Sequence, residues 1–176
     1  NNPLMACGWQ TERWFTVCTE VIYGYMANIL GKNPTRQYAI YSGSPGGSWS
    51  SNPNTHMIVS YFGPSGLGYI PNSPPPEIQW NGNAAGVNNA INNGCFILQH
   101  RDHGSITGWG EPSYSASNLS GLNNTNYPFV FSINCLTGKY NHSGESFSEA
   151  FHRMQYGALG VTAASEVSYS FVNDTY

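Results

Sequence analysis

Short apolar runs separated by turn-forming residues divide the chain into alternating elements. Cys95–Gln99 and Phe129–Ile133 are two such runs, the first following Gly94 and the second leading into Asn134. Runs of this length between turn signals predict buried strands of a parallel sheet, although periodicity alone does not separate them from buried helix. Further strands are predicted over three segments, Pro3–Gly8, Tyr38–Tyr41 and Ala158–Ala163.

Between these runs, apolar residues recur at helical spacing. The longest predicted helix covers Thr11–Leu30 and is followed by Gly31, a residue that commonly ends helices. Its apolar face follows the i, i+3, i+4, i+7 pattern and comprises Trp14, Cys18, Val21, Ile22, Tyr25, Met26 and Ile29. Shorter helices are predicted over Asn83–Asn93 and Ala116–Leu122, and a capping box that begins at Ser146 opens another.

The alternation of strands and helices is typical of a doubly wound α/β domain. We predict a single domain over residues 1–176, with Cys95–Gln99 and Phe129–Ile133 as parallel neighbours in the centre of the sheet, covered by helices. The Gly-rich stretch 42–54 lacks both the phosphate-binding Lys-Ser/Thr and the dinucleotide fingerprint, so we interpret it as a plain loop. Met57–Phe62 is interpreted as a strand or part of a connection, Gly63–Trp80 as irregular, and Ile106–Ser115 as a loop.

Composition narrows the functional classes. Only 9% of the residues are charged, against about 25% in an average domain. The net charge of −3 offers no basic surface for nucleic acid, and no apolar run reaches the length of a membrane span. We therefore expect neither a nucleic-acid partner nor a membrane-spanning segment.

The chain opens NNPLMACGW, with neither an initiator Met nor a signal peptide. We therefore expect a processed piece of a longer polypeptide, whose other segments would be its partners. Four cysteines lack zinc-ligand spacing, and we expect no disulfide among them. Low charge and the glycosylation sequon at Asn141 favour a secreted or cell-surface protein.

Reactive side chains follow the two central runs. His103 stands just beyond the first run and before Gly104, and Cys135 follows the second run. The carboxyl ends of parallel strands share one edge of a sheet, which is where open α/β sheets place their sites. A thiol and an imidazole at one edge predict a cysteine nucleophile with a histidine acid/base. The alternative is structural, with the thiol as buried packing and the imidazole as part of a turn.

Several motifs around these residues occur in a recognisable order. They are Asn92-Asn93-Gly94, His103-Gly104-Ser105, Trp109, the run Pro128–Phe131 leading to Cys135, Ser146–Ala150 and Gly157–Ala164. In this order the chain resembles the gingipain-type cysteine peptidases of the caspase-like clan, with residues 44–80 matching poorly. The resemblance implies a caspase-haemoglobinase-like three-layer fold, with a mostly parallel central sheet and helices on both faces. It also implies an endopeptidase that hydrolyses peptide bonds.

The resemblance assigns roles by motif. Cys135 would be the nucleophile that forms a thioester and His103 the general acid/base, with backbone N–H groups near Gly104 and Cys135 as the oxyanion hole. An acidic residue near the end of the first strand belongs to the family pattern, but this chain reads Gly8–Glu12 there, so the third catalytic member stays open. Arg101, on the same face as His103, is expected to form a structural pair with Asp102 rather than to bind substrate.

The resemblance also implies where specificity would arise. Glu12 and Glu166 would line the primary pocket, with Tyr169 and Phe171 as apolar walls, which would suit a basic substrate side chain. The alternative is that Glu12 stabilises a helix N-terminus and that Glu166 is a solvated loop residue.

No cofactor is expected, although the resemblance allows calcium, and no metal ligands are assigned. Two other functions stay open, a catalytically silent binding or scaffold relative and a sortase-like transpeptidase.

Overall fold

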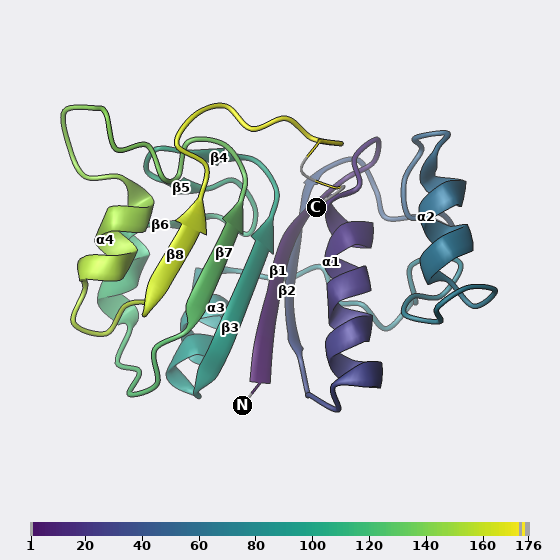
Figure 1. Cartoon of the computed structure of the whole chain (residues 1–176), viewed down its shortest axis with the longest axis horizontal. Helices are drawn as coiled ribbons and strands as arrows, with labels where there is room; N and C mark the ends of the chain where they lie inside the picture. Colours follow the sequence, from purple (N-terminus) through teal and green to yellow (C-terminus); the bar gives the residue numbers. More distant parts are fainter. Residues whose placement is uncertain (1, 173, 175–176) are drawn as a thin grey trace.

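A computed structural model of the chain describes residues 2–172 and 174. Its main feature is a five-stranded, all-parallel sheet in the order β2-β1-β3-β7-β8. The strands are β1 Asn2–Gln10, β2 Thr35–Ser42, β3 Cys95–Arg101, β7 Phe129–Ile133 and β8 Gly160–Ala163. Figure 1 shows these strands side by side with their carboxyl ends at one edge of the sheet. The predicted fold class is confirmed, and β3 and β7 are parallel neighbours as expected.

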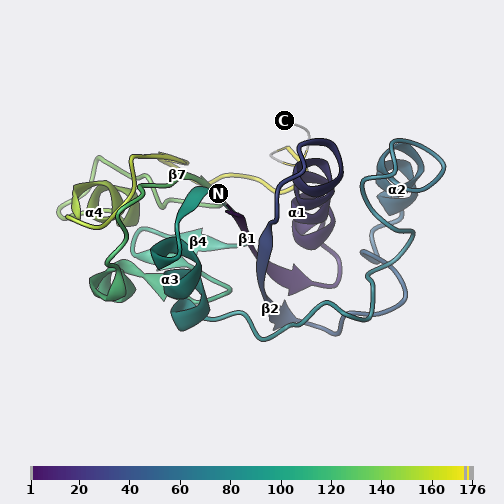
Figure 2. The same ribbon diagram turned by 90° about the horizontal axis from the view of Figure 1, so that it is seen from below.

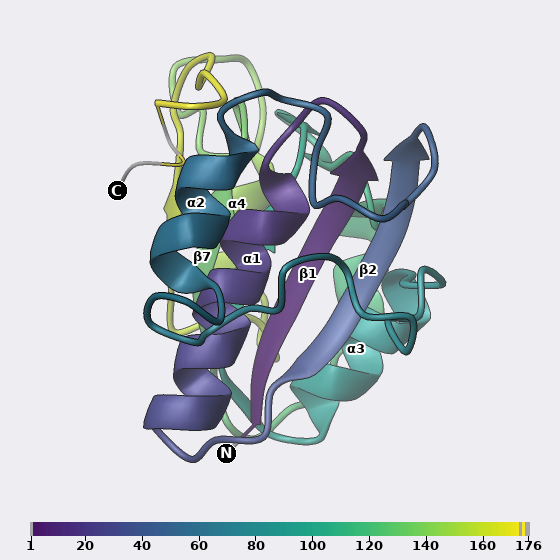
Figure 3. The same cartoon turned by 90° about the vertical axis from the view of Figure 1, so that its right-hand side faces the viewer.

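Helices cover both faces of the sheet. They are α1 Phe15–Gly24, which continues as a π-helical turn over Tyr25–Ile29, α2 Thr55–Phe62, α3 Ala84–Asn92 and α4 Phe147–Arg153, with a 3₁₀ helix η2 over Ala116–Gly121. Figure 2 shows α1 and α3 on opposite faces, and Figure 3 shows α2 beside α1 on the side away from the sheet.

Two apolar clusters fill the spaces between these layers. One lies under α3 and α4 and includes Leu98, Trp109, Val130 and Phe147, all buried. The other lies under α1 and α2 and is built around buried residues Met5, Cys7, Val17, Tyr38, Trp49, Ile70 and Ile78. Alternate residues of β1 contribute to the two clusters because successive side chains of a strand point to opposite faces.

Helices cover one strand, β7, less completely than we expected. Phe129 and Phe131 lie on the α1 face of β7, in register with Ile97 and Gln99 of β3. Their rings lie 5.2 Å apart, and Phe129 is 38% exposed. Because α1 packs mainly against β1, this face of β7 stays partly open to solvent.

Three local predictions were wrong. The first helix begins at Phe15 rather than at Thr11, because the chain first makes a turn in which the backbone N–H of Arg13 donates to the Gln10 carbonyl at 2.9 Å. Met57–Phe62 is helical, since α2 turns Ile58, Val59 and Phe62 towards the cluster under α1.

The third wrong prediction concerns the loop over residues 106–115. Two of its segments, β5 Gly108–Trp109 and β6 Tyr114–Ser115, pair with β4 Gly104–Ser105 in a small antiparallel sheet. Elsewhere, the capping box at Ser146 is present. The stretches 43–54 and 63–80 contain no helix or strand, as we predicted for them.

Candidate functional site

The ends of β3 and β7 bring the two reactive residues to the same edge of the sheet. Gly104 lies so close to the turn after β7 that a side-chain carbon there would be 2.6 Å from Asn134 Oδ1 and 2.9 Å from the Cys135 carbonyl oxygen. Real Cβ atoms do not approach other atoms this closely, so only Gly fits. The His-Gly pair and the Cys135 turn therefore lie beside one another, as the sequence predicted.

Side chains from three other elements surround the His103 imidazole. Its Nε2 lies 2.7 Å from Gln10 Oε1 at the end of β1. The Phe15 ring stands nearly perpendicular to the imidazole with centroids 5.3 Å apart, and the Tyr41 ring lies 4.7 Å away. These contacts hold the half-buried imidazole against the β1 and β2 side of the edge.

The same surroundings favour the neutral imidazole. Burial lowers the pKa of His103 below its usual value, and the positive charges of Arg13 and Arg101 lower the pKa further, while Glu12 opposes them. A neutral imidazole can accept a proton from a thiol, as a general base must.

The C-terminal segment passes over Cys135. Its thiol donates to the carbonyl of Ser168 at 3.3 Å, and Figure 1 shows the segment after β8 crossing the strand ends towards α1. Phe171, at φ 69°, packs edge-on against Trp14 with centroids 4.7 Å apart. The described residues include no hydrogen bond between the thiol and the imidazole, which is common in unliganded sites.

A buried ion pair fixes the far part of this segment. Nη2 of Arg101 lies 2.6 Å from Asp174 Oδ1, and both side chains are almost fully buried. Asp174 also accepts from the backbone N–H of Phe171 at 3.1 Å. The expected pairing of Arg101 with Asp102 is therefore wrong, because Asp102 points to the opposite face of the strand.

Asp102 is buried, and it forms no ion pair among the residues that the structure describes. Its Oδ2 accepts from the backbone N–H of Glu111 at 2.5 Å, while its Oδ1 has no hydrogen-bond partner within the described part of the chain. Burial raises the pKa of this carboxyl to about 7, against the lowering effect of two backbone N–H donors, those of His103 and Glu111. Gly8 and Gly110 leave room for it, since a Cβ at Gly8 would be 2.5 Å from the carboxyl carbon.

A polar network lies beneath the Cys135 turn. The His100 ring stacks on Trp109 at 4.1 Å, and burial lowers the pKa of His100 to about 3, so this imidazole is neutral. Its Nε2 lies 3.0 Å from the Glu111 carbonyl and therefore donates, which leaves Nδ1 to accept from the Asn134 amide at 2.8 Å. Asn134 is thus fixed immediately before Cys135.

The other three cysteines lie in different surroundings. Burial raises the pKa of the Cys7, Cys18 and Cys95 thiols, that of Cys95 to about 11. All four cysteines are free thiols in the structure.

The residues assigned to specificity each have different contacts. The Glu166 carboxylate lies 2.6 Å from Lys139 Nζ and is largely exposed. Glu12 is exposed before α1 and accepts from the Gln10 amide. Tyr169 is 71% exposed, whereas Phe171 is half-buried against Trp14. Because α1 begins at Phe15, Glu12 lies outside the helix and does not cap it.

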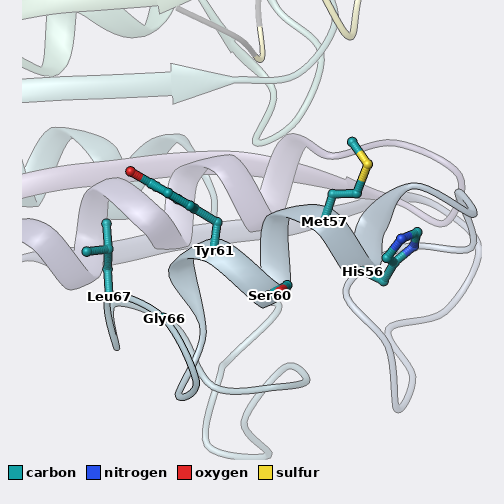
Figure 4. A pocket seen from close by; sticks show the side chains of 6 residues that line it. All are labelled: His56, Met57, Ser60, Tyr61, Gly66 and Leu67. Carbon is teal, nitrogen blue, oxygen red and sulfur yellow. The ribbon is translucent and has the colours of Figure 1, made fainter.

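A separate hollow lies on the surface of α2, where Met57, Tyr61 and Leu67 project from one side (Figure 4). The residues that line it come from α2 and the turn after it, far along the chain from both strand ends. Within residues 2–172 and 174, no three His, Cys, Asp or Glu side chains are placed to hold a metal ion. The described helices include none long and apolar enough to cross a membrane.

Sequence reasoning missed two residues at this edge. Gln10 contacts His103, but the first strand was predicted to end at Gly8, which left Gln10 outside the sheet. Asn134 carries only a turn signal in the sequence. The parallel pairing of β1 with β3 would have placed the end of β1 beside His103, since Cys7 is in register with Arg101.

The parallel sheet and the helical layers on both of its faces define an α/β protein with a caspase-like fold. The model of peptidase family C25 matches residues 44–176. The chain belongs to this family. The match includes residues 44–80, where the sequence motifs alone resemble the family poorly.

Two gingipains are similar in sequence to part of this chain. Gingipain R2 of Porphyromonas gingivalis is 34% identical over 67 residues, which are 38% of this chain and 9% of that protein. Gingipain R1 of the same organism is also 34% identical over 67 residues, covering 7% of its length. A crystal structure of the Arg-specific cysteine proteinase gingipain R matches with a TM-score of 0.67 at 18% identity, over 98% of this chain and 34% of that chain. The likeness of the structures establishes the fold, and this chain spans about a third of that proteinase.

Proposed function

We propose that the protein is a cysteine endopeptidase in which Cys135 is the nucleophile and His103 the general acid/base. The observation that supports this most strongly is the approach of Gly104 to Asn134 and to the Cys135 carbonyl. This approach holds the His-Gly pair and the cysteine at the same edge of the sheet. The family to which the chain belongs, peptidase family C25, also supports the proposal.

The chemistry follows from these positions. The imidazole accepts the thiol proton, and the sulfur attacks the substrate carbonyl to form a thioester. The imidazolium then protonates the leaving amine, and water hydrolyses the thioester with the imidazole as base. Backbone N–H groups near Gly104 and Cys135 would stabilise the oxyanion, which is commonly the largest catalytic contribution.

Substrate must displace one contact before this sequence can begin. The Ser168 carbonyl accepts the thiol hydrogen, so this bond has to break, by rotation of the thiol or a shift of the segment after β8, before the proton can pass to His103. A basic substrate side chain is the preference that we propose, with Glu12 and Glu166 as candidate partners and Tyr169 and Phe171 beside them. Binding there requires Glu166 to leave Lys139, or Glu12 to turn from Gln10.

The setting of the enzyme is also a proposal. We expect peptide or protein substrates and a location outside the cell or at its surface. Other segments of a longer chain are the expected partners, because the match covers 34% of the gingipain R structure. Calcium remains an expectation from the family resemblance.

Peptide hydrolysis by variants tests the proposal. A peptide library is digested by wild type, Cys135→Ala, His103→Ala and the control Cys95→Ala, whose thiol is buried at the opposite end of β3. We expect cleavage by wild type and the control, and a loss of about 10³-fold or more in both site variants. Equal cleavage by all four proteins would overturn the proposal.

The same digests distinguish the alternatives. With glycinamide added, a transpeptidase gives amidated products that mass spectrometry detects, whereas a hydrolase gives free carboxylates. If the wild-type protein cleaves no peptide, the protein is better explained as a catalytically silent binding or scaffold relative of the peptidases. Repeating the digest with Glu12→Gln and Glu166→Gln tests the basic pocket, since cleavage after Arg or Lys should collapse in one of them.

A further inference from the structure

One amide links the imidazole to the start of the loop before α1. Gln10 ends β1, its Oε1 lies 2.7 Å from His103 Nε2, and its Nε2 donates to the Glu12 carboxylate. The sequence left open which residue accompanies the Cys-His pair, and this position holds an uncharged side chain. The inference that follows rests on the proposed function and concerns how its imidazole is held.

The direction of each hydrogen bond follows from the carboxylate. An ionised carboxylate only accepts, so the Gln10 group that faces Glu12 must be the NH₂. The carbonyl oxygen of the amide therefore faces His103, and an oxygen there requires a hydrogen on Nε2. The neutral imidazole is then protonated on Nε2 and leaves Nδ1 as its acceptor.

Packing limits the other ways of meeting this requirement. The ring is held between Phe15 and Tyr41, whose centroids lie 5.3 and 4.7 Å away. Neither ring contact selects a nitrogen, because aromatic packing is similar for both tautomers. Among the described residues, Gln10 makes the only hydrogen bond to this imidazole.

We propose that Gln10 is a positioning residue that holds His103 in its Nε2-protonated form, and that Glu12 orients Gln10 for this purpose. Nδ1 is then the nitrogen that takes the Cys135 proton and later returns it to the leaving amine. The proton count balances, since each proton accepted at Nδ1 is given up there within one turnover.

Charge distinguishes this arrangement from one with a carboxylate at the same position. The titratable and charged groups around His103 are Glu12 and Arg13 before α1, Arg101 and Asp102 at the end of β3, Tyr41 on β2 and Cys135 after β7. An amide orients the imidazole but stabilises the imidazolium less than a carboxylate does, so the base stays neutral to lower pH than it would beside a carboxylate. A carboxylate at position 10 would instead raise the pKa of His103.

The test measures the tautomer directly. The full chain is labelled with ¹⁵N-histidine in a Cys135→Ala background, so that His103 titrates without a coupled thiol, and the two ring-nitrogen shifts are followed from pH 4 to 9. The variants are Gln10→Leu, Gln10→Glu and the control Gln79→Leu, an exposed glutamine whose amide donates to the Glu77 carbonyl. Peptide hydrolysis is measured with the same substitutions in the Cys135 protein.

We expect wild type and the control to show one tautomer, with hydrogen on Nε2. Gln10→Leu should give a mixture and lower kcat about 10-fold with KM unchanged, and Gln10→Glu should keep the tautomer and raise the pKa of His103 by about one unit or more. The proposal is overturned if Gln10→Leu keeps a single tautomer, or if it mixes the tautomers without lowering kcat.

Failure of the proposed function would look different. A wild-type protein that shows the single tautomer but hydrolyses no peptide would overturn the proposed function, and with it any positioning role for Gln10. If Gln10→Leu keeps a single tautomer while the wild-type protein hydrolyses peptides, only the role of Gln10 is overturned.

Discussion

The two halves of the candidate site are held in different ways. His103 is fixed by side chains from regular elements, namely Gln10 of β1, Phe15 of α1 and Tyr41 of β2. Cys135 lies in a turn, and its thiol bonds to a backbone carbonyl of a segment without regular structure. The difference indicates that the proposed acid/base is preorganised, whereas exposure of the proposed nucleophile depends on the C-terminal segment.

Releasing that segment should have the largest effect. Asp174→Asn removes the charge that pairs with buried Arg101, and breaking a buried pair from one side costs about 3–5 kcal/mol. Urea unfolding should show this loss in the free energy of unfolding, and Cys135 should react faster with iodoacetamide under native conditions.

An exposed ion pair provides the matched control. Glu145→Gln breaks the pair with Arg153, whose side chains are 40% and 74% exposed, and such pairs contribute about 0–1 kcal/mol. Equal losses in the two variants would contradict the role given to Asp174.

In the His103 half of the site, the neighbouring residue Asp102 makes the free energy of unfolding depend on pH. Because the pKa of Asp102 is raised to about 7 in the folded chain, the folded state binds this proton more tightly between about pH 4 and 7. Its contribution to stability is therefore lost as the pH rises through that window, by about 1.4 kcal/mol per pH unit.

A comparison of variants isolates this effect. His100, with a pKa lowered to about 3, gives the opposite slope, since the unfolded state binds its proton more tightly. Subtracting the unfolding free energies of wild type from those of Asp102→Asn removes the His100 contribution. The difference should grow from pH 4 to 7, and a constant difference would contradict a buried, protonated Asp102.

The junction between the halves depends on one glycine. In Gly104→Ala the new carbon would lie 2.6 Å from Asn134 Oδ1, so the His103 and Cys135 turns must move apart. We expect kcat/KM for peptide hydrolysis to fall about 10²-fold, the effect of a misplacement of about 1 Å. Gly46→Ala, whose Cβ would meet nothing within 4 Å, should retain full activity.

The sequence predicted the scaffold of the site better than its contacts. Buried parallel strands are uninterrupted apolar runs, so β3 and β7 could be placed with His103 and Cys135 at their ends. The helix α2 was misassigned because Met57–Phe62 is short, and its helical form depends on packing against α1. Partners far apart in sequence, such as Arg101 with Asp174, have no local signal.

The residues around the imidazole show the same limit. Gln10 carries no motif, and it contacts His103 because β1 pairs in register with β3. Glu166 and Glu12 were assigned by position in the chain, but their contacts depend on how Lys139 and Gln10 fold beside them.

Labelling with a peptidyl chloromethyl ketone tests the central claim most directly. The reagent needs a reactive thiolate beside a peptide-binding site, and burial raises the pKa of Cys7, Cys18 and Cys95. Peptide mapping of the native protein after a short reaction should find Cys135 modified and the other three intact, with His103→Ala labelled far more slowly. Equal modification of all four cysteines, or labelling of Cys135 that does not depend on His103, would contradict the account.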